Sequence, residues 1–386
     1  MEFTQEHNIF RRSVRKFIDT EINPYVDEWE KAGTFPAHEL FGKMGEMGFL
    51  GMSYPEEFGG GGLDYSYNVV LAEEMGRVNC AGIPMAVAVQ TDMATPALAQ
   101  FGSDELKIKY LKPAVEGKMV AAIAVSEPNA GSDVASIGTT AESDGDDYII
   151  NGSKTYITNG TQADWLCLLA RTQPGSGFKG MSLIIVPTDL PGFTVSRKLE
   201  KLGNWSSDTA ELSFENVRVP KANRIGEEGM GFILQMQQFQ KERLIGSVLG
   251  HSGMSRIVKM TVKYCRERKT FGLPLIDNQW IHFKLAELIT ELEFLKQMNN
   301  HCARMMLKGE DATREVSMAK LKAGRLAREV ADTCIQFHGG MGYMEEYPMA
   351  RYFRDARLLS IGGGADEIML GIIAKFEDIL PRRKKS

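Results

Sequence analysis

The spacing of apolar residues changes twice along the chain. Up to about residue 115, apolar side chains such as Phe10, Val14 and Phe17 recur three or four positions apart. That spacing places them on one face of an α-helix. Ser103 precedes two acidic residues, which is typical of a helix N-terminus because the hydroxyl can accept a bond from a free backbone N–H. The first part of the chain is therefore predicted to be helical.

The middle of the chain has a different pattern. Between Met119 and Pro220, short runs rich in β-branched and aromatic residues alternate with Gly, Asp, Asn and Pro, as in strands joined by turns. After Gly226 the helical spacing returns, and Gly231–Lys269 could form one continuous helix. The order helix, sheet, helix predicts an α+β multidomain protein. The expected domains are 1–118, 119–224 and 225–386.

Size and charge narrow the class of protein. A chain of 386 residues is too long for one ordinary core. Its 43% hydrophobic and 25% charged residues are typical of a folded protein. The net charge of −5 argues against a nucleic-acid partner, which usually requires a basic face.

Cysteine and histidine usage predicts neither disulfides nor a metal site. The five cysteines are scattered without a CxxC pair, so we expect buried free thiols in a reducing compartment. The six histidines lack metal-ligand spacing. No run approaches the roughly 20 apolar residues of a membrane span, and the N-terminus lacks the apolar segment of a signal peptide. We therefore expect no membrane span and a bacterial cytoplasmic location, or the mitochondrial matrix if the chain has been processed.

Two stretches in the middle segment carry candidate chemistry. Ala124–Asp133 reads as a strand that enters a tight turn rich in small and hydroxyl residues, and composition alone favours an ordinary β-turn. In Lys154–Gly160 an aromatic residue is followed by Thr and Asn. Such a strand end could stack on a flat ring and hydrogen-bond its edge.

Read together, these stretches resemble the acyl-CoA dehydrogenase family. The resemblance continues at Arg268–Gly272, at Gln336–Tyr343 and at Tyr352–Arg357. The motifs occur in the family's order from about residue 5 to residue 380. Separate motifs in register are far more specific than one glycine-rich loop.

The resemblance implies a helical N-terminal domain, a central β-barrel domain and a C-terminal four-helix bundle. It also implies a homotetramer, a dimer of dimers, with one FAD per subunit whose adenosine half is held across a subunit boundary. Tyr156 stands where relatives usually have Trp. The implied FAD contacts are Ile123, Ala124, Val125, Ser126, Ser132, Tyr156, Ile157, Thr158, Arg268, Thr270, Phe271, Gln279, Gln336, Gly339, Gly340, Ala365 and Glu367.

The catalytic base is not where most of the family has it. Dehydrogenating a thioester requires a base for the α-proton, and most members place a glutamate in the loop that here reads Ser360–Ile368. Aligned on Glu367, the glutamate position is Gly363. A minority of the family, resembling the isovaleryl, long-chain and citronellyl-CoA types, carries the carboxylate on the long C-terminal-domain helix in a pattern like Glu-Arg-Leu. This chain has Glu242 there.

The helical pattern around Glu242 supports a role as base. Phe239, Ile245 and Leu249 fall within about 60° of it on a helical surface, so Glu242 shares a mainly apolar stripe. Burial would raise the pKa of a glutamate towards neutrality, which suits a general base. An ordinary surface glutamate is the alternative. Because Gly363 removes the other carboxylate, we favour Glu242 as the base.

Other roles follow from the resemblance. The Gly363 N–H and a ribityl hydroxyl of FAD are expected to donate to the thioester carbonyl. Arg243 matches an arginine beside the active site, whereas Gln240 and Ala365 replace residues that usually contact CoA and FAD. The implied substrate contacts are Ser132, Arg243, Gly362, Gly363 and Gly364.

The triglycine loop, residues 362–364, is open to two interpretations. It is either a flexible loop or a pocket widened for a bulky acyl group. The second favours a branched or medium-to-long acyl chain, such as an isoprenoid. Met85, Met93 and residues 84–89 could line its channel, although ordinary core packing explains them equally well.

The resemblance alone leaves two properties undecided between related activities: the electron acceptor and the direction of the reaction. The family's usual electron acceptor is electron-transfer flavoprotein. The alternatives are an acyl-CoA oxidase, whose chains are usually much longer, and an enoyl-CoA reductase, whose direction depends on the partner's potential. A non-catalytic flavoprotein resembling the DNA-binding members would require a basic surface, which the net charge of −5 disfavours.

Overall fold

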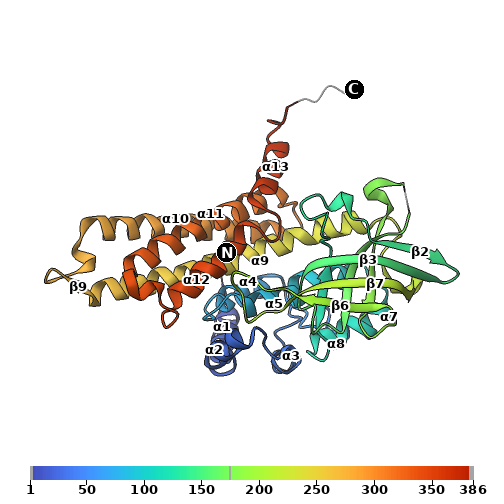
Figure 1. Ribbon diagram of the computed structural model, residues 1–386, viewed down its shortest axis with the longest axis horizontal. Coiled ribbons are helices and arrows are strands. Elements are labelled where there is room, and N and C mark those ends of the chain that lie inside the picture. Colours follow the sequence, from blue (N-terminus) through green and yellow to red (C-terminus); the bar gives the residue numbers. More distant parts are fainter. Residues whose placement is uncertain (1–2, 174, 382–386) are drawn as a thin grey trace. The chain divides into compact units, whose positions relative to one another are not determined.

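The computed structural model describes residues 3–173 and 175–381 (Figure 1). The chain forms two compact units. We call one the helical unit; it comprises Met1–Asn23, Val69–Ala81 and Arg243–Ser386. The other, the sheet unit, comprises Pro24–Asn68 and Gly82–Glu242.

The sheet unit begins with short helices. One of them has the predicted N-terminal cap: the Ser103 side chain accepts a hydrogen bond from the Leu106 N–H at 3.3 Å. Asp92 lies within a π-helical segment, η4. The helical elements of this part are α2 (Val26–Ala32), α3 (Ala37–Glu46), α5 (Gly82–Ala88), η4 (Val89–Ala94), α6 (Pro96–Phe101), α7 (Asp104–Leu106), η5 (Lys107–Leu111) and α8 (Lys112–Val115).

Among the described residues of the sheet unit, eight strands form one sheet, as the change of spacing at Met119 predicted. Their order is β6-β7-β3-β2-β4-β5-β8, and β1 pairs in parallel with β4. The strands are β1 (Ala121–Ala124), β2 (Thr140–Asp144), β3 (Asp147–Thr158), β4 (Trp165–Arg171), β5 (Met181–Pro187), β6 (Phe193–Lys198), β7 (Thr209–Pro220) and β8 (Arg224–Ile225).

Strand β4 explains why this segment reads as a continuous apolar run. Trp165, Cys167 and Leu169 pack in a core that includes helical residues, whereas Leu166 and Leu168 pack in a second core. Nearly all members of the second core belong to strands. A strand buried on both faces needs apolar residues at every position. The sheet therefore curls around a core of its own and also packs against helices.

The helical unit is built on long helices (Figure 1). Helix α11 contacts α10, α12 and α13. Helix α9 ends at Glu267, two residues earlier than predicted, because the β9–β10 hairpin begins at Lys269. The elements are α1 (Gln5–Phe17), α4 (Ser66–Met75) and α9 (Gly231–Glu267), which each reach this unit in part or whole, then β9 (Lys269–Thr270), β10 (Leu273–Pro274), α10 (Gln279–Leu307), α11 (Thr313–His338), η10 (Gly339–Tyr343), α12 (Pro348–Ala356), η11 (Arg357–Ser360) and α13 (Asp366–Phe376).

The cysteines follow the sequence prediction: all five are buried and carry free thiols. Within residues 3–173 and 175–381, no helix is long and apolar enough to cross a membrane. The same residues hold no group of three or more His, Cys, Asp or Glu side chains placed to bind a metal ion.

Candidate active site

The structure brings the two motif stretches of the sheet unit together. The Thr155 N–H donates to the Ser126 carbonyl at 2.9 Å, which joins the end of β1 to β3. A register irregularity between Lys154 and Ile157 places Tyr156 at φ 62° with 71% of its side chain exposed. Bulges commonly re-aim a side chain beside a functional site. The Tyr156 ring therefore presents an open aromatic face next to the strand end.

A buried ion pair between Lys154 and Glu127 anchors the strand end beside Tyr156. The Lys154 side chain is 0% exposed, and its Nζ donates to the Glu127 carboxylate at 2.8 Å and to the Val125 carbonyl at 2.9 Å. Glu127 also accepts the backbone N–H groups of Gly138 and Thr139 at 2.6 and 3.0 Å. Burial lowers the pKa of Lys154 to about 8, against the attraction of the carboxylate. Lys154 thus ties the strand end to the base of the loop that follows it.

Arg171 fixes the far side of the same loop. Its guanidinium donates to the carbonyls of Ile137 at 2.7 Å, Ala135 at 2.6 Å and Gly177 at 3.0 Å. Ser132, near the middle of the loop, is exposed. The loop therefore presents Ser132 while its second half is anchored by Glu127 and Arg171.

The lowered pKa of the Glu127 carboxyl leads us to expect that the stability of the fold falls at acid pH. Burial would raise the pKa of its carboxyl, but the charge and hydrogen bond of Lys154 and the N–H donors outweigh burial and lower it. A carboxylate whose pKa is lower in the folded state stabilises the fold above its unfolded pKa and loses that contribution as pH falls through the folded value. We expect the stability of wild type relative to Glu127→Gln to shrink below about pH 4.5. Thermal unfolding of both proteins between pH 3 and 7 measures this, and parallel curves would contradict it.

In the helical unit, two groups of predicted FAD contacts lie close together. One group is in the β9–β10 hairpin, and the other is at the C-terminal end of α11. The Tyr264 hydroxyl donates to the His338 carbonyl at 3.3 Å, and Trp280 packs edge-on against Phe337 at 5.2 Å between ring centroids. These contacts join the hairpin's base to the end of α11. Phe271 at its tip is fully exposed, at φ 51°. The predicted FAD contacts that are exposed here are Arg268, Thr270, Phe271, Gln279, Gln336, Gly339 and Gly340.

The triglycine loop has a conformational reason for two of its glycines. Gly363 and Gly364 adopt φ 65° and 97°, which side chains rarely tolerate. A Cβ atom at Gly364 would also lie 2.8 Å from Met369 Cε. Only Gly362 lacks such a reason, so any widening of an acyl pocket rests on that residue. Ala365, the N-cap residue of α13, is half-buried and Glu367 is exposed.

Beside Lys241, which precedes Glu242 on α9, the sheet unit carries a buried polar cluster. Asp92 is 3% exposed and accepts hydrogen bonds from Tyr65 at 3.0 Å and Asn68 at 3.2 Å. Burial raises the pKa of Asp92 and lowers that of Lys241, whose amine lies 5.4 Å from the Tyr65 ring centroid. Glu242 itself is half-buried.

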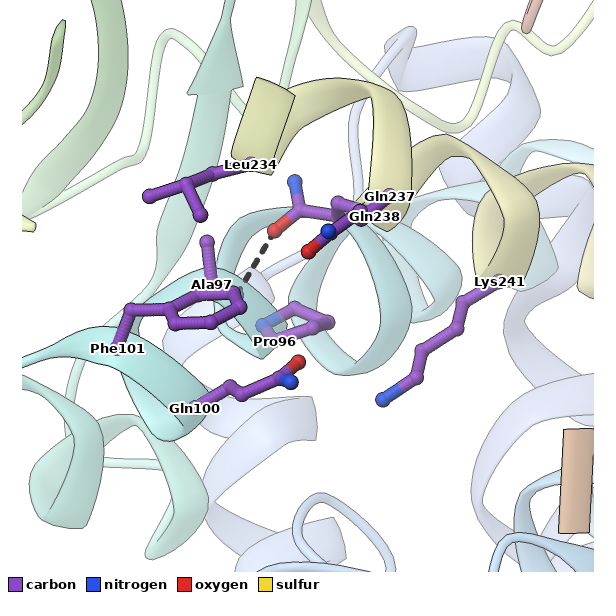
Figure 2. A pocket seen from close by; sticks show the side chains of 8 residues that line it. All are labelled: Pro96, Ala97, Gln100, Phe101, Leu234, Gln237, Gln238 and Lys241. Carbon is purple, nitrogen blue, oxygen red and sulfur yellow. Dashed lines mark hydrogen bonds between the residues drawn. The ribbon is translucent and has the colours of Figure 1, made fainter. Parts of the chain in front are cut away.

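A small pocket lies against the face of α9 that carries Leu234, Gln238 and Lys241 (Figure 2). In it, the Gln238 side chain accepts the Ala97 N–H at 2.9 Å, and the Lys241 side chain extends along one wall. The expected channel residues Met85 and Met93 are not part of its lining, so their role stays a prediction. The lining residues are Pro96, Ala97, Gln100, Phe101, Leu234, Gln237, Gln238 and Lys241.

Comparison with known families decides the class. The N-terminal, middle and C-terminal domain models of acyl-CoA dehydrogenases match residues 4–118, 122–217 and 229–377. The chain belongs to the acyl-CoA dehydrogenase family. It is an FAD-dependent enzyme that dehydrogenates acyl-CoA.

Individual relatives span nearly the whole enzyme. The mitochondrial long-chain specific acyl-CoA dehydrogenase of Sus scrofa is 40% identical over 97% of this chain and 86% of its own length. A crystal structure of an acyl-CoA dehydrogenase from Geobacillus kaustophilus has 40% identity and a TM-score of 0.94, covering 97% of this chain and 99% of that one. A 3-(aryl)acrylate reductase of Clostridium sporogenes is 37% identical over 97% of this chain and 99% of its own length.

The residues present fit FAD. The open face of Tyr156, backed by the anchored strand end, is suited to a flat ring. The exposed Arg268 supplies a permanently charged donor suited to a pyrophosphate. Sequence reasoning missed the residues that anchor the strand end and the loop beside Tyr156, namely Lys154, Glu127 and Arg171. One signal was available, because alternation from the buried Tyr148 places Lys154 on the inner face of β3.

Proposed function

We propose that Glu242 is the base that removes the α-proton of the acyl-CoA, yielding a trans-2-enoyl-CoA. FAD, when bound, accepts the hydride from the β-carbon. The observation that carries this assignment is the triglycine loop. The position that holds the base in most of the family is a glycine at φ 65°, so a carboxylate must come from elsewhere, and Glu242 is half-buried on α9.

The Gly363 N–H is proposed to stabilise the enolate that forms as the proton leaves. It donates to no acceptor within residues 3–173 and 175–381, and Gly363 is exposed. A donor aimed at the developing oxyanion is typically worth about 3–4 kcal/mol. Arg243, 7% exposed, donates from Nε to the Gly363 carbonyl at 3.4 Å and so lies beside this group.

The FAD-binding residues of the helical unit support an oligomer. Phe271 and its neighbours in the hairpin are exposed aromatic and charged groups. Large exposed apolar side chains mark interaction sites. We propose that a second copy completes the FAD site here, within a homotetramer that is a dimer of dimers, and that electron-transfer flavoprotein receives the electrons.

The acyl group is proposed to be branched or medium-to-long. The identity to a long-chain specific relative and the absence of a side chain at Gly362 support this. Anaerobic bleaching of the bound flavin by a panel of straight, 3-methyl-branched and isoprenoid acyl-CoAs tests both reaction and substrate. Fastest bleaching by a short straight chain would refute the proposed acyl group, and no bleaching by any thioester would refute the reaction.

Enoyl-CoA reduction is a second candidate, because a relative of equal coverage is a 3-(aryl)acrylate reductase. The bleached flavin is the starting point of its test. Reoxidation by an enoyl-CoA that is faster than reoxidation by electron-transfer flavoprotein would favour reduction. Rapid peroxide formation in air would instead favour an oxidase.

A further inference from the structure

We propose that Lys320 is a positioning residue that fixes the direction of the Gly363 N–H. Lys320 belongs to α11 and is 2% exposed, and its Nζ donates to the Gly364 carbonyl at 2.5 Å. Lysine is almost never fully buried unless its charge is paired or hydrogen-bonded. The inference rests on the proposed function, which gives the Gly363 N–H its role.

The backbone on either side of the loop is held by ordinary helical bonds. The N–H groups of Ile361 and Gly362 both donate to the Leu358 carbonyl, at 2.8 and 2.9 Å. The Ala365 carbonyl accepts two N–H groups of α13, at 2.9 and 3.1 Å. The peptide groups between these two sets of bonds belong to neither helix.

Side chains from two other helices hold those intervening groups. Arg243 of α9 reaches the Gly363 carbonyl at 3.4 Å, and Lys320 of α11 reaches the Gly364 carbonyl at 2.5 Å. The lysine contact is much the shorter, so it is the stronger restraint. Both cations belong to the helical unit, as does the loop.

The loop needs such restraints because glycine has little conformational preference of its own. Gly363 and Gly364 stand at φ 65° and 97°, and glycine populates many other backbone conformations about as readily. A charge-assisted bond to the Gly364 carbonyl selects one of them. The Gly363 N–H, which has no acceptor among the described residues, then points in one direction before substrate arrives.

Removing the lysine donor should therefore affect the chemical step more than binding. A misplacement of about 1 Å in a catalytic group can cost about 100-fold in rate. For Lys320→Met we expect flavin reduction by a bound acyl-CoA to slow by roughly 10- to 100-fold, with KM changed much less. Lys320→Arg, which keeps a charged donor, should recover part of the rate.

The test uses the FAD-loaded enzyme with a ¹³C-labelled thioester. Anaerobic stopped-flow measures the rate of flavin reduction, and isotope-edited infrared spectroscopy measures the carbonyl stretch of the bound thioester. A polarised carbonyl absorbs at lower frequency, so Lys320→Met should lose part of the wild-type downshift, which a purely structural role would not change. Lys322→Met is the matched control, since Lys322 lies on the same helix, is exposed and pairs with Glu291.

The outcomes separate this inference from the proposed function. A Lys320→Met enzyme that retains FAD with a wild-type rate and carbonyl frequency overturns the role of Lys320 alone. If that variant fails to retain FAD, Lys320→Gln, which keeps a neutral donor, is judged by the same two readouts. A wild-type flavin that no acyl-CoA reduces refutes the proposed function and this inference with it.

Discussion

Glu242→Gln is expected to bind FAD and acyl-CoA and yet lose dehydrogenation by several orders of magnitude. The substitution keeps the size of the side chain and its position on α9, but an amide cannot take up the α-proton. General bases typically contribute about 100- to 10,000-fold to rate. No carboxylate replaces it at residue 363, where the chain has glycine at φ 65°. The measurement is single-turnover flavin reduction under anaerobic conditions.

Two controls make this result specific to the base. Glu142→Gln changes an exposed glutamate on β2 and should leave the rate unchanged. The second control is binding of acyl-CoA to Glu242→Gln, monitored by the change in the flavin absorption spectrum. Wild-type binding shows that the site is still formed. Near-wild-type turnover by Glu242→Gln would end the assignment.

Lys154→Met should produce the largest loss of stability and of bound FAD. The substitution leaves the Glu127 carboxylate in its partly buried position without the ammonium that pairs with it at 2.8 Å. Removing one member of a buried ion pair typically costs about 3–5 kcal/mol. The Val125 carbonyl also loses a donor at 2.9 Å, so the strand end that is proposed to face the flavin loosens. Thermal unfolding and the FAD content of the purified protein measure the two effects.

The expected loss depends on the buried position of Lys154, and removing a positive charge elsewhere should not reproduce it. Lys118→Met removes a lysine that is 71% exposed and pairs with Glu116 at the surface, and it should change stability by less than about 1 kcal/mol. Adding Glu127→Gln to Lys154→Met should restore only part of the loss, because the carboxylate also holds the Gly138 and Thr139 N–H groups. Full FAD occupancy in Lys154→Met would show that the ion pair does not shape the flavin site.

The sequence determined the elements because their signals are local. The change from helical to strand spacing at Met119, the Ser103 cap and the long helix from Gly231 all appear in the structure, the helix two residues shorter than predicted. Each depends on residues a few positions apart, which periodicity and side-chain chemistry record directly. The family motifs likewise singled out Tyr156, which the structure exposes beside the end of β1.

Only the tertiary structure decided which residues hold these groups in place. Lys154 meets Glu127 27 positions away, and Lys320 meets the carbonyl of Gly364 44 positions away. Neither pairing leaves a pattern in the sequence: strand alternation can place Lys154 on the inner face of β3, but it does not show which distant group the lysine meets. The triglycine loop is similar: its composition left a flexible loop and a widened pocket both open, whereas the positive φ of Gly363 and Gly364 shows a backbone conformation that favours glycine.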